Sequence, residues 1–381
     1  MDSLGVMVRT RVYSIRSLGA AAVVTLLAVV AAGCGSSSSD GSSPASSTGA
    51  APVTVAGSVV STAGSSNEAQ IVVPDAVAAE WAALGGDNGV EWVAVAGDGT
   101  TTTEPAAVAG ADATAALTKQ LNAFQAQAPG RDALAGLDAV ASPAGSPVWV
   151  FSPLLDTRGA LDMNQLAFDQ SPPDVVNAVT AAGELPDLTG RQVNFVVTPV
   201  AGEQNALSDV QVGYQHAIWE GVATAAGAEK VTFYDGTGTG AGTGTVPVVA
   251  TPDPTDKISS EGSGPTRTCT LPTPALFMPN EATLIDKSAT LTALGECVGS
   301  VDPTTKITVQ GHTAAVGGGD PQGAVDLSTQ RATEVAALLQ EIGVPAENIT
   351  SVVGLGDSAP LVQPASDPGN RAVVVTFTST G

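Results

Sequence analysis

Basic residues are scarce in this chain of 381 residues, where 14 Lys and Arg stand against 37 Asp and Glu and the formal net charge is -23. A surface of this charge repels nucleic acid and the anionic headgroups of lipids. The composition therefore excludes nucleic acid as a partner. Any attachment to a membrane must come from something other than surface charge.

Histidine and cysteine are scarce as well, with two and three residues, which leaves few ligands for a metal site or a redox centre. The chain also lacks a GxSxG motif, a P-loop lysine and a GxGxxG motif. The sequence therefore lacks the motifs that hydrolase, NTPase and dinucleotide-binding activities require. We expect no catalytic residue, no metal and no cofactor, and we expect that the protein is not an enzyme.

The amino terminus carries an export signal pattern. Three arginines precede the apolar run Leu18 to Ala32, which is short for a membrane span and long enough for a signal peptide. Ala31-Ala32-Gly33-Cys34 follows, and the whole resembles a bacterial lipoprotein signal. The resemblance implies that residues 1–33 are removed and that Cys34 carries acyl chains such as palmitate. An uncleaved signal anchor and ordinary secretion with cleavage elsewhere remain open alternatives.

Two segments have the composition of linkers. Residues 34–69 begin with a Ser- and Gly-rich stretch, and residues 236–265 are rich in Gly, Thr and Pro. Such segments cannot bury a core. The sequence predicts a tether over 34–69, a folded domain over 70–235, a linker over 236–265 and a second domain over 266–381.

The second domain shows a strand, a Gly-rich loop and a helix. Ile307 and Val309 alternate with polar residues, as a half-buried strand requires. The loop over 314–325 holds four glycines and a proline, so we expect it to be non-helical. Apolar residues then recur at helical spacing up to Ile342, with Asp326 or Ser328 as the expected N-cap.

Four motifs in this part carry a family resemblance: GHT at 311–313, LSTQRA at 327–332, VVGLGDSAP at 352–360 and Asn370-Arg371. In this order they resemble the C-terminal domain of OmpA, peptidoglycan-associated lipoproteins and flagellar motor protein B. The resemblance covers residues 266–381 and implies a βαβαβ domain. It also implies non-covalent binding of the diaminopimelate residue of the peptidoglycan stem peptide.

The resemblance assigns the ligand carboxylate to Arg331. The family has an Asp directly after GHT and an Asn before LSxxRA, where this chain has Ala314 and Ala324. Asp320 and Asp326 are candidates to replace the missing acid, although a turn residue and an N-cap are the simpler interpretations of these two. A structural salt bridge is the alternative for Arg331.

Three further residues complete the predicted binding site. His312 and Thr313 belong to the GHT loop, in which His312 is expected to orient the loop and not to act as a catalyst. Asn370, together with Arg371, is expected to stabilise the last strand and to lie at the rim of the site.

Cys269 and Cys297 remain once Cys34 is assigned to lipid, and an even pair in an exported protein favours a disulfide. This bond is expected to join the entry of the second domain, before a strand at Ala275 to Met278, to a first helix at Asp286 to Val298.

The first domain alternates between β-rich runs and helical stretches, which predicts a mainly parallel sheet covered by helices. The expected strands are Gln70 to Val73, Glu91 to Ala96, Val148 to Ser152, Val193 to Thr198 and Val231 to Tyr234. The expected helices are Ala76 to Leu84, Thr114 to Ala128, Asp174 to Ala182 and Asp209 to Ala226. The stretch VWVFSPLLDTRGALD resembles von Willebrand A-like sheets and the α/β halves that precede OmpA-like domains in some actinobacterial lipoproteins. The DxSxS metal motif of the former is missing.

The leading hypothesis is therefore an α/β protein of the cell envelope that is lipid-anchored on the outer side of the membrane and binds peptidoglycan through residues 266–381. The alternative is a solute- or protein-binding envelope lipoprotein that acts through the first domain, with weakened or lost peptidoglycan binding. The missing acid at Ala314 is the feature that favours this alternative.

Overall fold

The computed structural model describes residues 54–62, 69–84, 88–108, 113–124, 128–200, 202–240, 248–252, 258–262, 265–299, 301–316 and 319–379. All of these belong to one compact unit, Pro52–Gly381. The predicted signal peptide and Cys34 lie outside the described residues.

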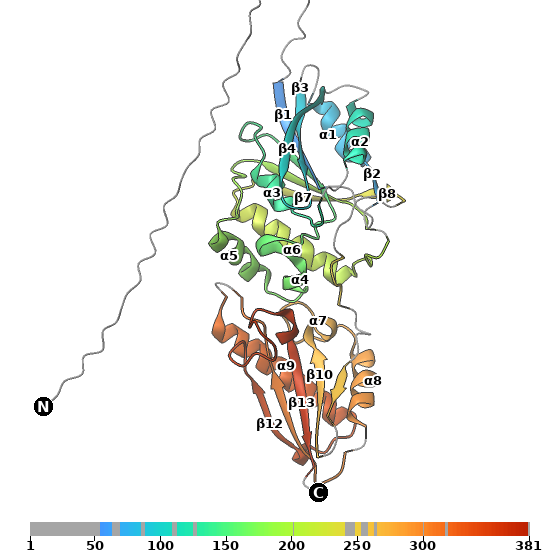
Figure 1. Ribbon diagram of the computed structural model, residues 1–381, viewed down its shortest axis with the longest axis vertical. Coiled ribbons are helices and arrows are strands. Elements are labelled where there is room, and N and C mark those ends of the chain that lie inside the picture. Colours follow the sequence, from blue (N-terminus) through green and yellow to red (C-terminus); the bar gives the residue numbers. More distant parts are fainter. Residues whose placement is uncertain are drawn as a thin grey trace, which may run out of the picture. The chain divides into compact units, whose positions relative to one another are not determined.

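The first sheet, which we call sheet A, has the strand order β4-β3-β1-β5-β6-β7 (Figure 1). All neighbours in it are parallel except β3 and β4. The mainly parallel sheet predicted for this part of the chain is therefore confirmed. Its strands are β1 (Thr54–Thr62), β3 (Asn88–Val95), β4 (Thr101–Val108), β5 (Val148–Ser152), β6 (Gln192–Val197) and β7 (Lys230–Asp235).

Helices cover both faces of sheet A. Figure 1 shows α1 and α2 beside one face and α3, α5 and α6 beside the other. We call sheet A with its helices the sheet A region. Its helical segments are α1 (Asp75–Ala83), α2 (Ala113–Ala123), α3 (Ala133–Asp138), η1 (Gly159–Leu161), α4 (Met163–Leu166), α5 (Pro172–Ala182) and α6 (Asp209–Ala225).

The core of this region lies on the two faces of the sheet. Consecutive residues of a strand point to opposite faces, so Val59 packs with α1 and α2 while Val60 packs with α3 and α6. On β5, Trp149 likewise belongs to the core beside α1 and α2, and Val150 to the core beside α3 and α6. Burial on both faces explains why these strands read as continuous apolar runs.

Strand β1 corrects one prediction. The tether predicted for residues 34–69 contains Thr54–Thr62, which pairs with β3 and β5 in the middle of sheet A. Small residues are required there, since a Cβ on Gly57 would lie 2.8 Å from the Trp149 ring. The Ser and Gly content that resembled a linker is the result of this close packing.

A second correction concerns the predicted linker. Residues Gln70–Val72 form β2 as a strand, but it pairs antiparallel with β8 (Thr237–Thr239) outside sheet A. The predicted linker over 236–265 therefore contains β8, and it also contains β9 (Ser259–Glu261). Backbone pairing needs no apolar side chain, so the Gly- and Thr-rich composition did not indicate these strands.

The second sheet, sheet B, has the strand order β12-β11-β13-β10-β9. Strands β11 and β12 are parallel, and β13 lies antiparallel between β11 and β10. Sheet B with its helices is called the sheet B region here. Its other elements are β10 (Thr266–Pro272), α7 (Thr273–Leu276), α8 (Lys287–Val298), β11 (Lys306–Gly311), α9 (Pro321–Glu341), η2 (Ala346–Asn348), β12 (Ile349–Gly354), η3 (Pro368–Asn370) and β13 (Ala372–Thr378).

Sheet B has its core on one face only. Along β11, Ile307 and Val309 are fully buried, whereas Thr308 and Gln310, which follow them, are only partly buried. The buried face packs against α8 and α9 through residues such as Leu294, Val335 and Leu339. This is the half-buried pattern predicted from the alternation along β11.

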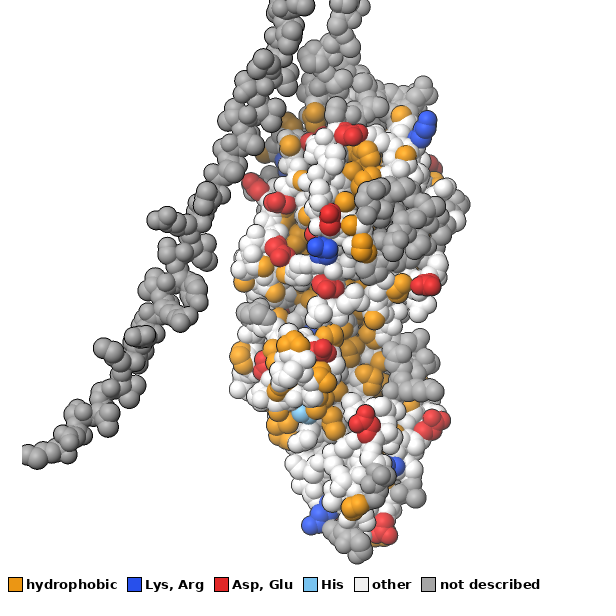
Figure 2. All heavy atoms as spheres, viewed as in Figure 1, with side chains coloured by type: hydrophobic (Ala, Val, Ile, Leu, Met, Phe, Trp, Pro, Cys, Tyr) orange, Lys and Arg blue, Asp and Glu red, His pale blue; other side chains and the backbone are white. Residues whose placement is uncertain are grey.

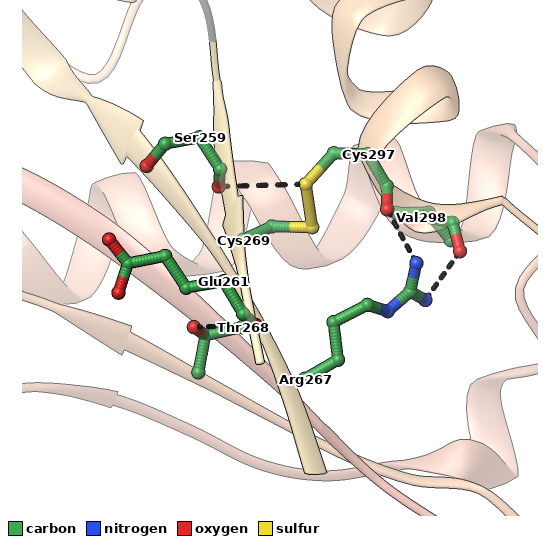
Figure 3. Close-up of a disulfide and its surroundings, with 7 residues drawn as sticks. All are labelled: Ser259, Glu261, Arg267, Thr268, Cys269, Cys297 and Val298. Atoms are coloured by element: carbon green, nitrogen blue, oxygen red, sulfur yellow. Dashed lines mark hydrogen bonds between the residues drawn. A yellow bond between two sulfur atoms is a disulfide. The ribbon is translucent and has the colours of Figure 1, made fainter. Parts of the chain in front are cut away.

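The predicted disulfide is present between Cys269 on β10 and Cys297 on α8 (Figure 3). Arg267 lies beside it and donates hydrogen bonds to the carbonyl oxygens of Cys297 and Val298, at 2.7 and 2.6 Å. The bond and the guanidinium together join the end of α8 to β10.

Two local predictions in this region are wrong. Residues Ala275 to Met278 do not form a strand, because the short helix α7 begins at Thr273 with Pro274 in its first turn, where proline is favoured. Helix α9 begins at Pro321, inside the segment predicted to be loop, and its N-cap is Asp320. Asp326 is therefore within the helix and is not its cap.

Acidic side chains lie scattered over the face seen in Figure 2. Among the described residues, no helix is both long enough and apolar enough to span a membrane. The same residues contain no group of three or more His, Cys, Asp or Glu that could hold a metal ion.

Candidate carboxylate-binding site

The GHT and LSTQRA motifs hold α9 against the ends of two strands. A Cβ on Gly311 would lie 2.1 Å from the Ser328 carbonyl oxygen, so only glycine allows β11 to approach the helix this closely. The Ser328 hydroxyl donates to the Val325 carbonyl oxygen and accepts from the Gly356 amide, both at 3.0 Å. These contacts fix the part of α9 that carries Arg331.

Arg331 is buried, with 1% of its surface exposed, and its guanidinium is bonded on every nitrogen. Nε donates to the Glu281 carbonyl oxygen at 2.8 Å, and the group lies 5.4 Å from the Phe277 ring centre. Nη1 and Nη2 donate to the two carboxylate oxygens of Asp169, at 2.8 and 2.5 Å. The predicted ligand-binding arginine thus already holds a carboxylate.

Asp169 comes from the sheet A region, in the short loop between α4 and α5. Ala167 and Phe168 directly before it adopt left-handed backbone conformations, with φ of 48° and 56°. Such conformations are uncommon for residues other than glycine. Phe168 is buried against Tyr214, which anchors the loop that presents Asp169.

Two more donors of the sheet B region bind the same carboxylate. The Thr273 hydroxyl, which is fully buried, donates to Asp169 at 3.0 Å. The backbone amide of Asn280 donates to it at 3.4 Å, and Asn280 has a left-handed conformation with φ of 56°. Arg331, Thr273 and Asn280 together form a receptor for a single carboxylate, and sequence reasoning identified only the first of them.

Arg371 lies close to this pair and is also buried, with 5% exposed. Burial lowers the pKa of Arg371, whereas the negative charge of Asp169 raises it. Its Nη1 has no hydrogen-bond partner among the described residues. Arg371 thus adds a second positive charge near the carboxylate of Asp169.

A cavity of about 440 Å³ opens beside these groups, at the start of α9. Residues of both regions line it. The sheet B region contributes, among others, Arg331, Arg371, Thr313, Ala314, Asp320, Ala324, Asp326 and Asp357, and the sheet A region contributes Asp169, Gln170, Ser171 and Asp174.

Both alanines that replace the family's polar residues, Ala314 and Ala324, line this cavity. Four carboxylates that are not bonded to Arg331 line it as well, from Asp174, Asp320, Asp326 and Asp357. Asp320 caps α9 by accepting from the Gln322 amide at 3.0 Å, and Asp326 accepts from the Gln322 side chain at 2.8 Å. The predicted pair of candidate acids thus reaches the same cavity as Arg331.

The GHT residues lie at the base of this site. His312 is buried, and its Nδ1–H donates to the Ala359 carbonyl oxygen at 2.9 Å, while burial lowers its pKa. Nε2 of His312 and Oγ1 of Thr313 have no partner among the described residues. Of the two, only Thr313 lines the cavity.

Asn370 has a different position from the one predicted. It is fully buried, and its side chain binds the backbone of Val362, Pro364 and Ala365 through four hydrogen bonds of 2.9 to 3.1 Å. These bonds use both amide hydrogens, and Asn370 is fully buried and does not line the cavity. Its role is to hold the loop over 362–365.

Comparison with known proteins identifies the sheet B region. Residues 276–373 match the model of the OmpA family, so this part of the chain is an OmpA family domain. No curated protein matches the chain.

Solved structures similar to this chain include OmpA-type domains of envelope proteins. The periplasmic domain of MotB from Helicobacter pylori is 16% identical, with a TM-score of 0.28, and the alignment covers 32% of this chain and 89% of that one. The cell wall anchor of the T6SS from Pseudomonas aeruginosa is 22% identical, with a TM-score of 0.28 and coverages of 32% and 88%. The peptidoglycan-associated lipoprotein from Burkholderia pseudomallei is 22% identical, with a TM-score of 0.23 and coverages of 29% and 89%.

Proposed function

We propose that the protein is a non-enzymatic envelope protein that binds peptidoglycan through its OmpA family domain. The observation that carries the proposal is the carboxylate receptor built from Arg331, Thr273 and the Asn280 amide, at the edge of a 440 Å³ cavity. A stem peptide has free carboxylates, and a bidentate guanidinium is well suited to bind one.

The second half of the ligand has acceptors in the same cavity. Diaminopimelate carries an ammonium group, for which the family uses the acid that is Ala314 here. In this chain the carboxylates of Asp320 and Asp326 are available instead, at the start of α9. We propose that one of them accepts the ammonium group, with Thr313 as a further contact.

Attachment to a membrane is the other part of the proposal. The lipoprotein-like signal places an acyl anchor at Cys34, and more than one acyl chain is needed for stable anchoring. With the anchor in the membrane and the OmpA family domain on the cell wall, the chain joins the two layers of the envelope.

Co-sedimentation of the full chain with insoluble cell wall tests this function. Arg331→Lys keeps the positive charge but loses the two parallel hydrogen bonds, and it should weaken retention about ten- to a hundredfold. Arg267→Ala is the matched control, because Arg267 belongs to the same region but binds the end of α8. Retention of Arg331→Lys at the wild-type level, with both variants folded by circular dichroism, would contradict the proposal.

A second function is favoured by one observation. Asp169 uses both terminal nitrogens of Arg331, and the acid after GHT is absent. If this pair only packs the two regions together, the protein binds a solute or a protein through the sheet A region instead. In that case the cell wall should retain neither the wild type nor any variant at Asp169.

A further inference from the structure

The carboxylate receptor of the OmpA family domain is filled by the chain itself. Asp169 accepts hydrogen bonds from Nη1 and Nη2 of Arg331, from the Thr273 hydroxyl and from the Asn280 amide. Every one of these donors belongs to the sheet B region, and the two charged side chains are only 1% and 2% exposed. The partners are 162 positions apart in the sequence.

A peptide carboxylate and an aspartate carboxylate present the same group to a guanidinium. The two terminal nitrogens of Arg331 form one fork, and both are bonded to Asp169. A ligand carboxylate can therefore take this position only after Asp169 has left it.

From this geometry we propose that Asp169 is an internal competitor of the cell-wall peptide, so that docking of the sheet A region and binding of the peptide at Arg331 exclude each other. The inference rests on the proposed function, and it adds a regulatory contact to it. Peptide binding releases the loop that carries Asp169, and any partner that pulls this loop away opens the site.

The surroundings of the pair suit an exchange of carboxylates. Arg371 lines the same cavity and has a guanidinium nitrogen without a partner among the described residues. This nitrogen is buried, so Arg371 contributes a positive charge beside Arg331 while Asp169 is still in place. The loop of Asp169 is short and begins with the left-handed residues Ala167 and Phe168, so its release does not require unfolding of a long helix.

Asp169→Asn in the full chain tests the competition, because asparagine has the same shape but no charge. The apparent affinity of a site equals its intrinsic affinity multiplied by the fraction of molecules in which the site is open. We expect Asp169→Asn to bind insoluble cell wall about ten- to a hundredfold more tightly than the wild type.

Asp138→Asn is the control, because Asp138 is exposed in the same region, does not line the cavity, and its substitution removes the same charge. It should leave retention unchanged. Arg331→Lys with Asp169→Asn should bind much more weakly than Asp169→Asn alone, since the competitor acts through Arg331.

A second readout does not depend on the stability of a variant. In the wild type, a soluble peptide that contains diaminopimelate should accelerate amide hydrogen exchange in residues 166–171, because the loop is released. Exchange in β1 and β5, which lie inside the sheet A region, should not change.

The outcomes separate the two proposals. If the wild type and Asp169→Asn bind the wall equally, the competition is wrong and the proposed function stands. If Asp169→Asn binds more weakly than the wild type, Asp169 supports the ligand and the competition is again wrong. If neither chain binds, the proposed function fails, and the competition fails with it.

Discussion

The two regions of this molecule bury their charged groups in different ways. In the sheet A region, Glu91 accepts hydrogen bonds from Ser58 and from the amides of Ala141 and Ser142, all within that region. In the sheet B region, the carboxylate bound to Arg331 belongs to the other region. The first arrangement forms whenever its sheet folds, whereas the second also requires that the regions dock. A buried acid whose partners lie in its own region, such as Glu91, stabilises the fold. A buried acid whose partner lies in the other region, such as Asp169, can act as a switch.

The largest expected effect on stability comes from removing the Glu91 carboxylate, whose partners all lie within the sheet A region. Glu91→Ala removes the acceptor of the buried Ser142 amide and of the partly buried Ala141 amide, and one of the two partners of the Ser58 hydroxyl. We expect a loss of about 3–5 kcal/mol in the free energy of unfolding, measured by urea denaturation. Glu104→Ala on the neighbouring strand β4, where the side chain is exposed, is the control and should have little effect. A loss in Glu91→Ala no greater than in this control would show that the arrangement does not stabilise sheet A.

The disulfide gives a somewhat smaller effect in the other region. Cys269 and Cys297 close a loop with a sequence separation of 28. Replacing both by alanine should destabilise the sheet B region by about 3–4 kcal/mol. Amide hydrogen exchange should become faster in β10 and β13 and stay unchanged in β1 and β5. Equal acceleration in both sheets would mean that the two regions unfold as one unit and do not differ in this respect.

The third effect depends on pH and lies in the sheet A region. Asp156 is buried, and burial raises its pKa to about 7, with a contribution from the nearby Asp132. Between the unfolded pKa of 3.8 and about 7, the folded state holds a proton that the unfolded state has lost, so stability falls as the pH rises through this window.

Asp156→Asn should therefore be more stable than the wild type at pH 8, by about 1–3 kcal/mol, and this gain should shrink as the pH approaches 4. Thermal denaturation at several pH values measures it, with the exposed Asp138→Asn as the control. A gain that does not change with pH would rule out the titration of Asp156 as its cause.

The sequence indicated the parts of the fold that depend on local signals. The alternation along β11, the glycine of GHT and the helix predicted from Asp286 to Val298 are all encoded within a few residues. The start of α9 was misjudged because Pro321 and Gly323 suggest a loop, although proline is accepted in the first turn of a helix.

Features that depend on distant partners were not predictable in the same way. The sequence of β1 resembles a linker because Gly57 packs against the Trp149 ring and Ser58 donates a hydrogen bond to Glu91. Asp169 has no sequence motif, and its partner is 162 residues away. Nothing in a single sequence indicates which aspartate meets which arginine over such a separation.

Binding of a peptide carboxylate at Arg331 can be followed directly through the side-chain Nε–H resonance of Arg331, while a soluble peptide containing diaminopimelate is added to the full chain with Asp169→Asn. We expect this resonance and the amide resonance of Asn280 to shift together and saturate, and the wild type to need about ten- to a hundredfold more peptide for the same shift. If the Arg331 resonance stays unmoved in both chains, the carboxylate receptor of this domain does not bind the cell-wall peptide.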